Sequence, residues 1–236
     1  MSPRRLIVNA DDLGQSPSIN AGIEQATRDG IVTSASLMVR WPSAASAARW
    51  AASHSEVSVG LHFDIGEWSY LDGEWSEVYR FVDPDDSRAV RDELENQLET
   101  FERLVGHGPT HLDSHQHVHR SEPVRSCMLD VARSIGVPLR EELGPVTYCG
   151  SFYGQSGKGE PYPEGITEVA LLAILDGLSD GTTEIGCHPG LDHSDLDSIY
   201  RLERALELRV LCVPGLRTEL RNRGIELCSY NDVAMI

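Results

Sequence analysis

The feature that most limits the fold of this chain is a regular alternation of short apolar segments with longer amphipathic ones. The apolar segments have the length of buried strands, and the amphipathic ones repeat their apolar residues every three or four positions, as helices do. This alternation predicts an α/β protein in which about seven parallel strands form a barrel. The expected strands are residues 6–9, 33–39, 57–63, 111–114, 137–140, 183–187 and 225–229. The expected helices are residues 17–29, 43–53, 87–105, 122–135, 166–178, 198–211 and 215–223.

Two segments lack both patterns. Gly66–Asp86 is polar and aromatic and contains glycine, proline and two tryptophans, so we predict a long loop there and consider it a candidate lid. Residues 141–165 are rich in glycine, proline and tyrosine, and we predict that they are irregular. The length of 236 residues suits one domain with a sizeable core, or two small ones.

Charge and cysteine usage exclude some classes of function. The chain has 20 Lys and Arg against 37 Asp and Glu, a net charge of -17, which disfavours nucleic acids and anionic membranes as partners. Its five cysteines are odd in number and form no CxxC pair, so we expect free thiols in a reducing compartment. The sequence shows neither an apolar run of signal-peptide length near its start nor one of about 20 residues elsewhere. These observations predict a cytoplasmic protein.

Four polar clusters each follow the C-terminal end of an expected strand. In a parallel barrel the C-terminal ends of all strands open on one face, where active sites form. Clusters that are distant in the sequence can therefore converge there, which is the main argument for a functional site. The clusters are Asn9–Asp12, Gly60–Asp64, His111–His119 and Gly186–Gly190.

The clusters differ in how strongly they indicate a metal. His115, His117 and His119 alternate with other residues, so on an extended strand all three face one way, together with His111 and Asp113. Such a face is costly to bury without a partner, and a metal ion supplies one. We therefore favour a metal site over a surface histidine-rich loop.

The other clusters have simpler explanations when each is taken alone. Asp11 and Asp12 point in different directions on a strand, so one can bind a metal while the other transfers protons, but such a pair also occurs in turns and helix caps. His62 and His188 alone resemble ordinary core residues, and the side chain of Cys187 is expected to point into the core.

The remaining histidines and the absent motifs narrow the choice further. His54, His107 and His193 fall at helix ends or in loops, and we expect them at the surface. The sequence has no GxSxG, P-loop or GxGxxG motif, so serine hydrolases, NTPases and dinucleotide-binding proteins have no support.

Taken together, these residues make the sequence similar to the YdjC-like carbohydrate deacetylases, the group that includes chitooligosaccharide deacetylases and hopanoid-associated relatives. The strings NADDLG and HLDSHQHVH are highly specific in combination, and the resemblance covers most of the chain. It runs through LIVNADDLG (6–14), GIVTSASLMV (30–39), GLHFDI (60–65), PTHLDSHQHVH (109–119), CHPG (187–190) and GIELCSYNDV (224–233).

The resemblance implies a single domain over residues 1–236 with a distorted TIM-like (β/α) barrel. It implies one divalent metal ion, magnesium or zinc, held by Asp12, His62 and His115. Asp11 would be the general base and His188 the general acid in the hydrolysis of an N-acetyl group on an amino sugar or short N-acetylated oligosaccharide. Candidate substrate-binding residues are Arg140, which would lie near the base, and Asp64, His117, His119 and Trp68.

Two alternatives stay open. One is a metal hydrolase of the amidohydrolase or phosphoesterase type, which a second metal held by His117 and His119 would favour. The other is a barrel that binds a sugar without turning it over. Trp68, Tyr70 and Trp75 could stack on sugar rings or cover the core beneath the long loop. We expect a small N-acetylated sugar as the partner, and a homodimer is an open alternative to a monomer.

Overall fold

The chain is built around one parallel sheet. The computed structural model describes residues 3–71, 73–192 and 200–234. The strands of the sheet are β1 (Arg4–Leu13), β2 (Ser34–Leu37), β3 (Ser58–Phe63), β6 (Leu112–Ser114), β7 (Val146–Cys149), β8 (Gly181–Cys187) and β9 (Ile225–Leu227). Among the described residues they follow the order β6-β3-β2-β1-β8-β7, and β9 pairs with β1 on the same edge as β2. All of these pairings are parallel, which confirms the expected α/β fold. Because β6 and β7 lie at its two edges, the sheet is an open, distorted barrel.

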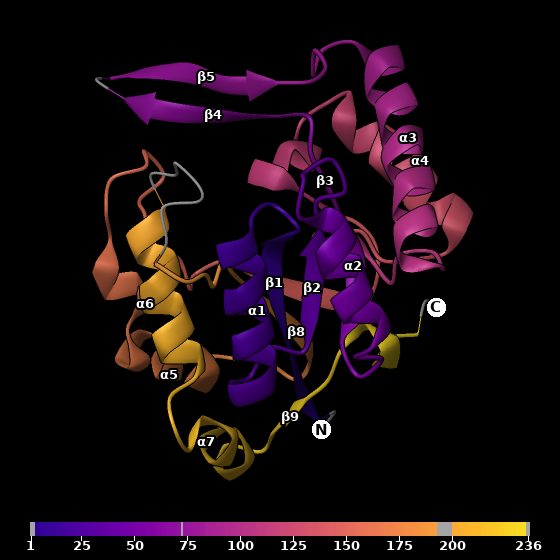
Figure 1. Ribbon diagram of the computed structural model, residues 1–236. Helices are drawn as coiled ribbons and strands as arrows, with labels where there is room; N and C mark the ends of the chain where they lie inside the picture. Colours follow the sequence, from indigo (N-terminus) through magenta and orange to yellow (C-terminus); the bar gives the residue numbers. More distant parts are fainter. Residues whose placement is uncertain (1–2, 72, 193–199, 235–236) are drawn as a thin grey trace.

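Helices cover the outside of this sheet (Figure 1). The helices are α1 (Pro17–Asp29), α2 (Ala44–Ala52), α3 (Ser87–Val105), α4 (Val124–Ile135), α5 (Glu168–Asp176), α6 (Arg201–Leu211) and α7 (Leu216–Asn222). Their ends follow local signals. The Ser16 hydroxyl caps α1 by accepting from the backbone N–H of Ile19, and Gly106 ends α3 in a left-handed conformation with φ of 90°. Short 3₁₀ turns are η1 (His115–Arg120), η2 (Pro163–Ile166) and η3 (Tyr230–Asp232).

The central strand β1 passes from the core to the functional face. Leu6, Ile7, Val8 and Ala10 are fully buried, because a parallel strand covered on both sides needs apolar residues on both faces. The polar residues that follow on the same strand are buried as well. The strand therefore carries carboxylates into a place where each must have a charged or hydrogen-bonding partner.

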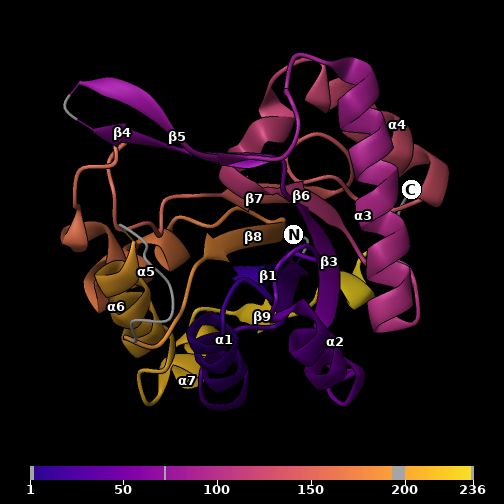
Figure 2. The same ribbon diagram turned by 45° about the horizontal axis from the view of Figure 1, so that its top comes forward.

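The expected loop at 66–86 is wrong. Residues there form an antiparallel hairpin of β4 (Gly66–Leu71) and β5 (Glu74–Arg80), which extends to one side of the molecule (Figure 2). Alternating aromatic and polar residues suit a ribbon that is exposed on one face. The Asp-Gly dipeptide at 72–73 is a common hairpin turn, and it is the sequence signal that could have revealed the hairpin.

The predicted strand at 137–140 is also wrong, and a strand lies where irregular structure was expected. Leu139 forms only isolated bridges, a parallel one with Leu112 and an antiparallel one with Leu143, whose carbonyl accepts from the Leu139 N–H. Glu141 then adopts a left-handed φ of 62°, which prevents the strand from continuing. β7 instead pairs with the far edge of β8, so the number of strands in the sheet is as expected although one of them lies elsewhere in the sequence.

Other boundaries are close to those expected. The helix expected at 87–105 has those bounds in the structure. The start of the helix expected at 198–211, together with His193, lies outside the described residues, and α6 is described from Arg201. In the described parts of the chain, no helix combines the length and the apolar character needed to span a membrane.

Candidate metal centre

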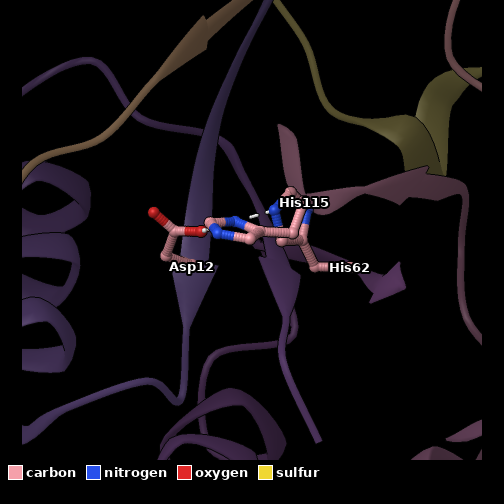
Figure 3. A group of neighbouring side chains, drawn as sticks. All are labelled: Asp12, His62 and His115. Atoms are coloured by element: carbon pink, nitrogen blue, oxygen red, sulfur yellow. Dashed lines mark hydrogen bonds and ion pairs between the residues drawn. The ribbon is translucent and has the colours of Figure 1, made fainter. Parts of the chain in front are cut away.

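Three side chains from separate strands meet at the C-terminal end of the sheet. Asp12 on β1, His62 on β3 and His115 at the start of η1 each offer one ligand atom, and these atoms lie within 4.8 Å of one another. The Asp12 Oδ1 atom is 3.1 Å from His115 Nδ1 and 3.4 Å from His62 Nε2 (Figure 3). The predicted convergence of distant clusters is thus present in the structure.

The backbone of Asp12 explains why two adjacent carboxylates serve different partners. Asp12 has a left-handed φ of 66°, which is uncommon for a residue other than glycine. Asp11 Oδ2 lies 2.7 Å from Arg140 Nη1, whereas Asp12 Oδ2 lies 2.6 Å from Arg204 Nη2. The divergence expected from strand alternation is therefore present, and the unusual backbone contributes to it.

The arrangement of the donors fits a divalent cation. His62 Nδ1 is 2.7 Å from Asp113 Oδ1, so the ring can donate its proton there and keep the lone pair of Nε2 for an ion. The remaining nitrogen of His115, Nε2, lies 3.4 Å from Glu67 Oε2. A histidine whose far nitrogen is held by a carboxylate is the usual setting of a metal ligand.

The charges of the group also indicate a cation site. Burial alone would lower the pKa of His62, but Asp113 and Asp11 raise it to about 10. Burial would likewise lower the pKa of His115, and the nearby carboxylates of Asp12 and Glu67 hold it well above its ordinary value. With no ion bound, protons on these rings supply the positive charge that the carboxylates require, so a metal must displace them.

One buried arginine holds three carboxylates behind the centre. Arg140 is 2% exposed, and its guanidinium bonds to Asp11 at 2.7 and 2.8 Å and to Glu184 at 2.6 and 2.9 Å, with Asp113 at 2.8 Å. Burial alone would raise the pKa of Asp11 and Asp113, but Arg140 holds both below their ordinary value. Asp11, His62 and Asp113 also form a compact group, but Arg140 already supplies its cation.

His188 follows β8 and lies beside Asp11. Its Nε2 is 3.8 Å from Asp11 Oδ2, and its backbone N–H donates to the Glu207 carboxylate, which also accepts from the Tyr200 hydroxyl. Burial lowers the pKa of His188 to about 4 despite the nearby Asp11 and Asp12, so the ring is neutral at neutral pH. Burial raises the pKa of Glu207 to about 8, and the donors from His188 and Tyr200 limit that rise.

Arg204 and Glu207 are site residues that the sequence reasoning missed. Both lie on α6, and both are buried on the face that also carries Leu208 and Leu211. Positions 204, 207, 208 and 211 have the spacing of one helical face. Charged residues on an otherwise apolar face are the signal that could have identified them, because a buried charge needs a partner.

The expectation that His115, His117 and His119 face one way is wrong. The strand ends at Ser114, and Gln116 and His117 adopt left-handed φ values of 51° and 53°. The Ser114 hydroxyl accepts from the backbone N–H of His119, which closes the chain into a turn. His115 therefore reaches Asp12 and His62, with which it forms the candidate metal-binding group, whereas His117 and His119 point elsewhere.

Asp12, His62 and His115 line a cavity of about 730 Å³. The β4–β5 hairpin also lines this cavity, through Trp68, Tyr70 and Trp75. Gln116 fixes the hairpin in place, because its side-chain amide bonds to both the backbone N–H and the carbonyl of Trp68. Trp75 is 63% exposed, so it does not serve to cover the core.

The remaining candidate substrate residues divide into two sets. His117 and Trp68 line the cavity, whereas Asp64, His119 and Arg140 are not among its lining residues. The Asp64 carboxylate instead accepts from the Trp41 indole and the Tyr79 hydroxyl beneath the hairpin. His111, expected on the same strand face, stacks on Tyr230 in the core, with ring centroids 3.9 Å apart.

An open parallel barrel with an Asp-His-His group at its strand ends places the chain among α/β-barrel proteins with a candidate metal centre. The chain belongs to the YdjC-like protein family, which matches residues 5–222. It is 34% identical to a carbohydrate deacetylase of Geobacillus stearothermophilus, over 98% of each chain. It is 32% identical to a chitooligosaccharide deacetylase of Klebsiella pneumoniae (strain 342), over 98% of this chain and 99% of that one.

A solved structure shares the fold. The family 4 carbohydrate esterase of Streptomyces lividans, determined in complex with acetate, superposes with a TM-score of 0.58 at 12% identity and covers 100% of this chain and 98% of that one. This likeness bears on the architecture alone, and it agrees with the expected distorted barrel.

Proposed function

We propose that this protein hydrolyses the N-acetyl group of an amino sugar or of a short N-acetylated oligosaccharide, releasing acetate and a free amine. The observation that carries the proposal is the pairing of a carboxylate and an imidazole, Asp11 and His188, 3.8 Å apart beside the Asp12, His62 and His115 group in one cavity. The names of the two relatives, carbohydrate deacetylase and chitooligosaccharide deacetylase, support the same reaction.

Asp12, His62 and His115 would hold one divalent ion. Two imidazoles suit zinc, and a carboxylate suits zinc or magnesium. When bound, such an ion polarises the carbonyl of the acetamide and makes a water molecule more acidic. Arg204 keeps Asp12 Oδ2 occupied and so leaves Oδ1, which faces both histidines, as the atom available to the ion.

We assign Asp11 the role of general base. Arg140 holds its carboxylate ionised and fixes its orientation through two hydrogen bonds, and the Asn9 side-chain amide donates to Oδ1 at 2.7 Å. An ionised carboxylate of fixed orientation at the cavity wall can take a proton from the water that attacks the acetyl carbon.

We assign His188 the role of general acid, because an amide nitrogen cannot leave as an anion and must be protonated. The ring begins the reaction neutral, so it must first receive a proton. Asp11 Oδ2 is 3.8 Å from His188 Nε2, beyond direct hydrogen-bond reach, so the proton taken from water would pass to the imidazole through one water molecule or after the ring closes on the carboxylate, and then to the departing nitrogen. The Glu207 carboxylate holds the backbone of His188 by accepting from its N–H. Glu207 Oε1 also lies 3.9 Å from His188 Nδ1.

The hairpin supports a sugar as the substrate. Trp68, Tyr70 and Trp75 line the same cavity as Asp12, His62 and His115, and aromatic rings stack on the apolar faces of sugars. A cavity of about 730 Å³ is roomy enough for more than one sugar ring. An oligosaccharide that places one ring at Asp11 and a second against the hairpin would contact both parts of the cavity lining.

Acetate release from a panel of N-acetylated mono- and oligosaccharides tests the proposal. Asp11→Asn and His188→Ala should each lower kcat by about 10²–10⁴-fold, the range that a proton-transferring group contributes. Both variants should retain the ion held by Asp12, His62 and His115, whereas Asp12→Ala should lose that ion and the activity together. His107→Ala, which removes an exposed histidine, is the control and should behave like the wild type.

Two results would replace the proposal by its rivals. Sugar binding without acetate release would indicate a non-catalytic barrel. Hydrolysis of phosphate esters or cyclic amides that depends on Asp11 and His188, with N-acetyl sugars untouched, would indicate a different metal hydrolase. Near-normal deacetylation by both variants would remove their assigned roles.

A further inference from the structure

A second group of ligand-type side chains lies on the other side of the turn that carries His115. His117, His119 and Glu141 each offer one ligand atom, and these atoms lie within 4.8 Å of one another. The group shares no residue with Asp12, His62 and His115. The left-handed backbone at Gln116 and His117 is what directs these two histidines away from His115.

Each of the two histidines has one ring nitrogen in use and one without a partner. His119 is fully buried, and its Nδ1 is 2.6 Å from the Ser114 hydroxyl. His117 Nε2 is 3.3 Å from the Tyr148 hydroxyl. Within the described residues, His119 Nε2 and His117 Nδ1 are buried and form no hydrogen bond. Buried polar atoms are nearly always paired, so two such atoms in one cluster call for a ligand.

The carboxylate of the group faces these nitrogens. Glu141 Oε2 lies 4.0 Å from His119 Nε2, too far for a hydrogen bond but suitable for an ion between them. Its present partner is Arg120, whose Nε is 2.6 Å away and whose side chain is 50% exposed. An ion pair as exposed as this one is weak, so Arg120 can withdraw when a cation arrives.

Unlike the group on the turn, the group of Asp11, His62 and Asp113 already contains its cation, so it needs no ion. There the fully buried guanidinium of Arg140 bonds to both carboxylates, and the Nδ1 of His62 bonds to Asp113. That group is complete as it stands. Among the described residues no buried cation bonds to the group on the turn, and Arg140 acts on His117 and His119 only through its charge at a distance.

We propose that His117, His119 and Glu141 form a second divalent-cation site, and that zinc is the ion it takes. Two imidazoles and one carboxylate are a donor set used by zinc, whereas magnesium favours oxygen ligands. Zinc bonds of about 2.0–2.2 Å in a tetrahedron place ligand atoms about 3.4 Å apart, so the three side chains would close on the ion by about 1 Å. His117 and Arg120 line the main cavity, which gives the ion a route to the site.

An ion there would hold the turn that presents His115. It would link η1, which carries His117 and His119, to the segment after β6 and α4 that carries Glu141. His115, which belongs to the group with Asp12 and His62, would then lie on a turn that both ions hold in place. The proposal concerns zinc binding and does not depend on the reaction proposed above. Because the two groups share no ligand, the second ion would hold the turn and would not form the two-metal catalytic centre that favours an amidohydrolase or phosphoesterase.

The test is the number of zinc ions that each chain retains. Metal-free protein is loaded with zinc chloride, desalted, and analysed for bound zinc, and affinity is measured by competition with a chelator. The wild type should bind two ions. His119→Ala and Asp12→Ala should each bind one, and the double variant none. His107→Ala, which removes an exposed histidine, should still bind two.

Further variants keep the test decisive if His119→Ala does not fold. Glu141→Gln should weaken the second ion at least tenfold, and Arg120→Gln should strengthen it by removing the competing guanidinium. One zinc ion in the wild type would overturn the proposal. So would an affinity for the second ion that Glu141→Gln leaves unchanged. Because the readout is bound zinc, a protein that binds two ions but releases no acetate would refute the proposed reaction and not this site.

Discussion

Replacement of Arg140 by methionine should destabilise the protein strongly, because it leaves three buried carboxylates without their shared cation. Removal of one member of a buried ion pair typically costs about 3–5 kcal/mol. Asp113 would keep its bond to His62, and Glu184 would keep the Tyr230 hydroxyl at 2.6 Å. Those surviving bonds keep the expected loss within that range although three carboxylates are affected.

The loss should appear as a clear shift of the melting temperature. A chain of 236 residues has an unfolding entropy of about 0.5 kcal/mol/K, from roughly 2.1 cal/mol/K per residue, so the expected decrease in Tm is about 6–10 °C. Differential scanning calorimetry of metal-free protein measures it. Arg125→Met is the matched control, because Arg125 pairs with Glu142 while its side chain is 42% exposed, and its loss should cost no more than about 1 kcal/mol.

The difference between wild type and Arg140→Met should also depend on pH, with a definite sign. In the wild type, Asp11 and Asp113 have pKa values below 3.8, so the stability they contribute is present above pH 3.8 and is lost as the pH falls through their native pKa values. Without Arg140, burial raises both pKa values above 3.8, and the variant loses stability as the pH rises from 3.8. The difference should therefore grow between pH 4 and pH 7.

Urea unfolding of the wild type and of Arg140→Met at several pH values measures this difference in stability. A difference below about 1 kcal/mol at pH 7, or one that is the same at pH 4.5 and pH 7.5, would refute the reasoning that Arg140 stabilises buried anions. Arg140→Lys should recover only part of the loss, because a single ammonium cannot reach three carboxylates in the geometry of a guanidinium.

Three further predictions concern other parts of the molecule. Gly60→Ala places a Cβ 2.5 Å from the His111 ring, so it should cost about 1–3 kcal/mol in chemical unfolding, whereas Gly157→Ala, with open space around it, should cost much less. Trp75→Ala should raise KM for N-acetylated oligosaccharides and leave Tm within about 1 °C, because Trp75 is 63% exposed; an unchanged KM would remove it from the substrate site. Glu207 has a pKa raised from 4.5 to about 8, so the unfolded chain ionises first and the wild type should lose stability relative to Glu207→Gln as the pH rises from 4.5 to 8; a difference independent of pH contradicts this.

The sequence was sufficient for the parts of the fold that local patterns determine. The helix at 87–105 shows one clear amphipathic face and has the predicted bounds, and the convergence of Asp12, His62 and His115 follows from the parallel arrangement of the strands that carry them. The roles assigned to these site residues stay predictions, and the experiments above address them.

The errors arise where the backbone leaves its regular conformation. Residue 141 and residues 116–117 adopt left-handed φ values without being glycine, which no local preference announces, and these positions ended an expected strand and split the histidine run. Arg204 was missed because its partner, Asp12, is 192 residues away in the chain. Such a pairing is visible only when tertiary structure brings the two together.

The position of β1 in the sheet has a consequence for synthesis of the protein. One edge of β1 can pair early with β2, but the other edge pairs with β8, and about 170 residues separate the two strands. At about 5–20 residues per second, the ribosome needs roughly 10–35 s to bridge that interval. During this time a growing chain carries an apolar strand with one unpaired edge, the kind of surface that joins neighbouring chains. Cells making this protein quickly should therefore depend on chaperones that shield nascent chains.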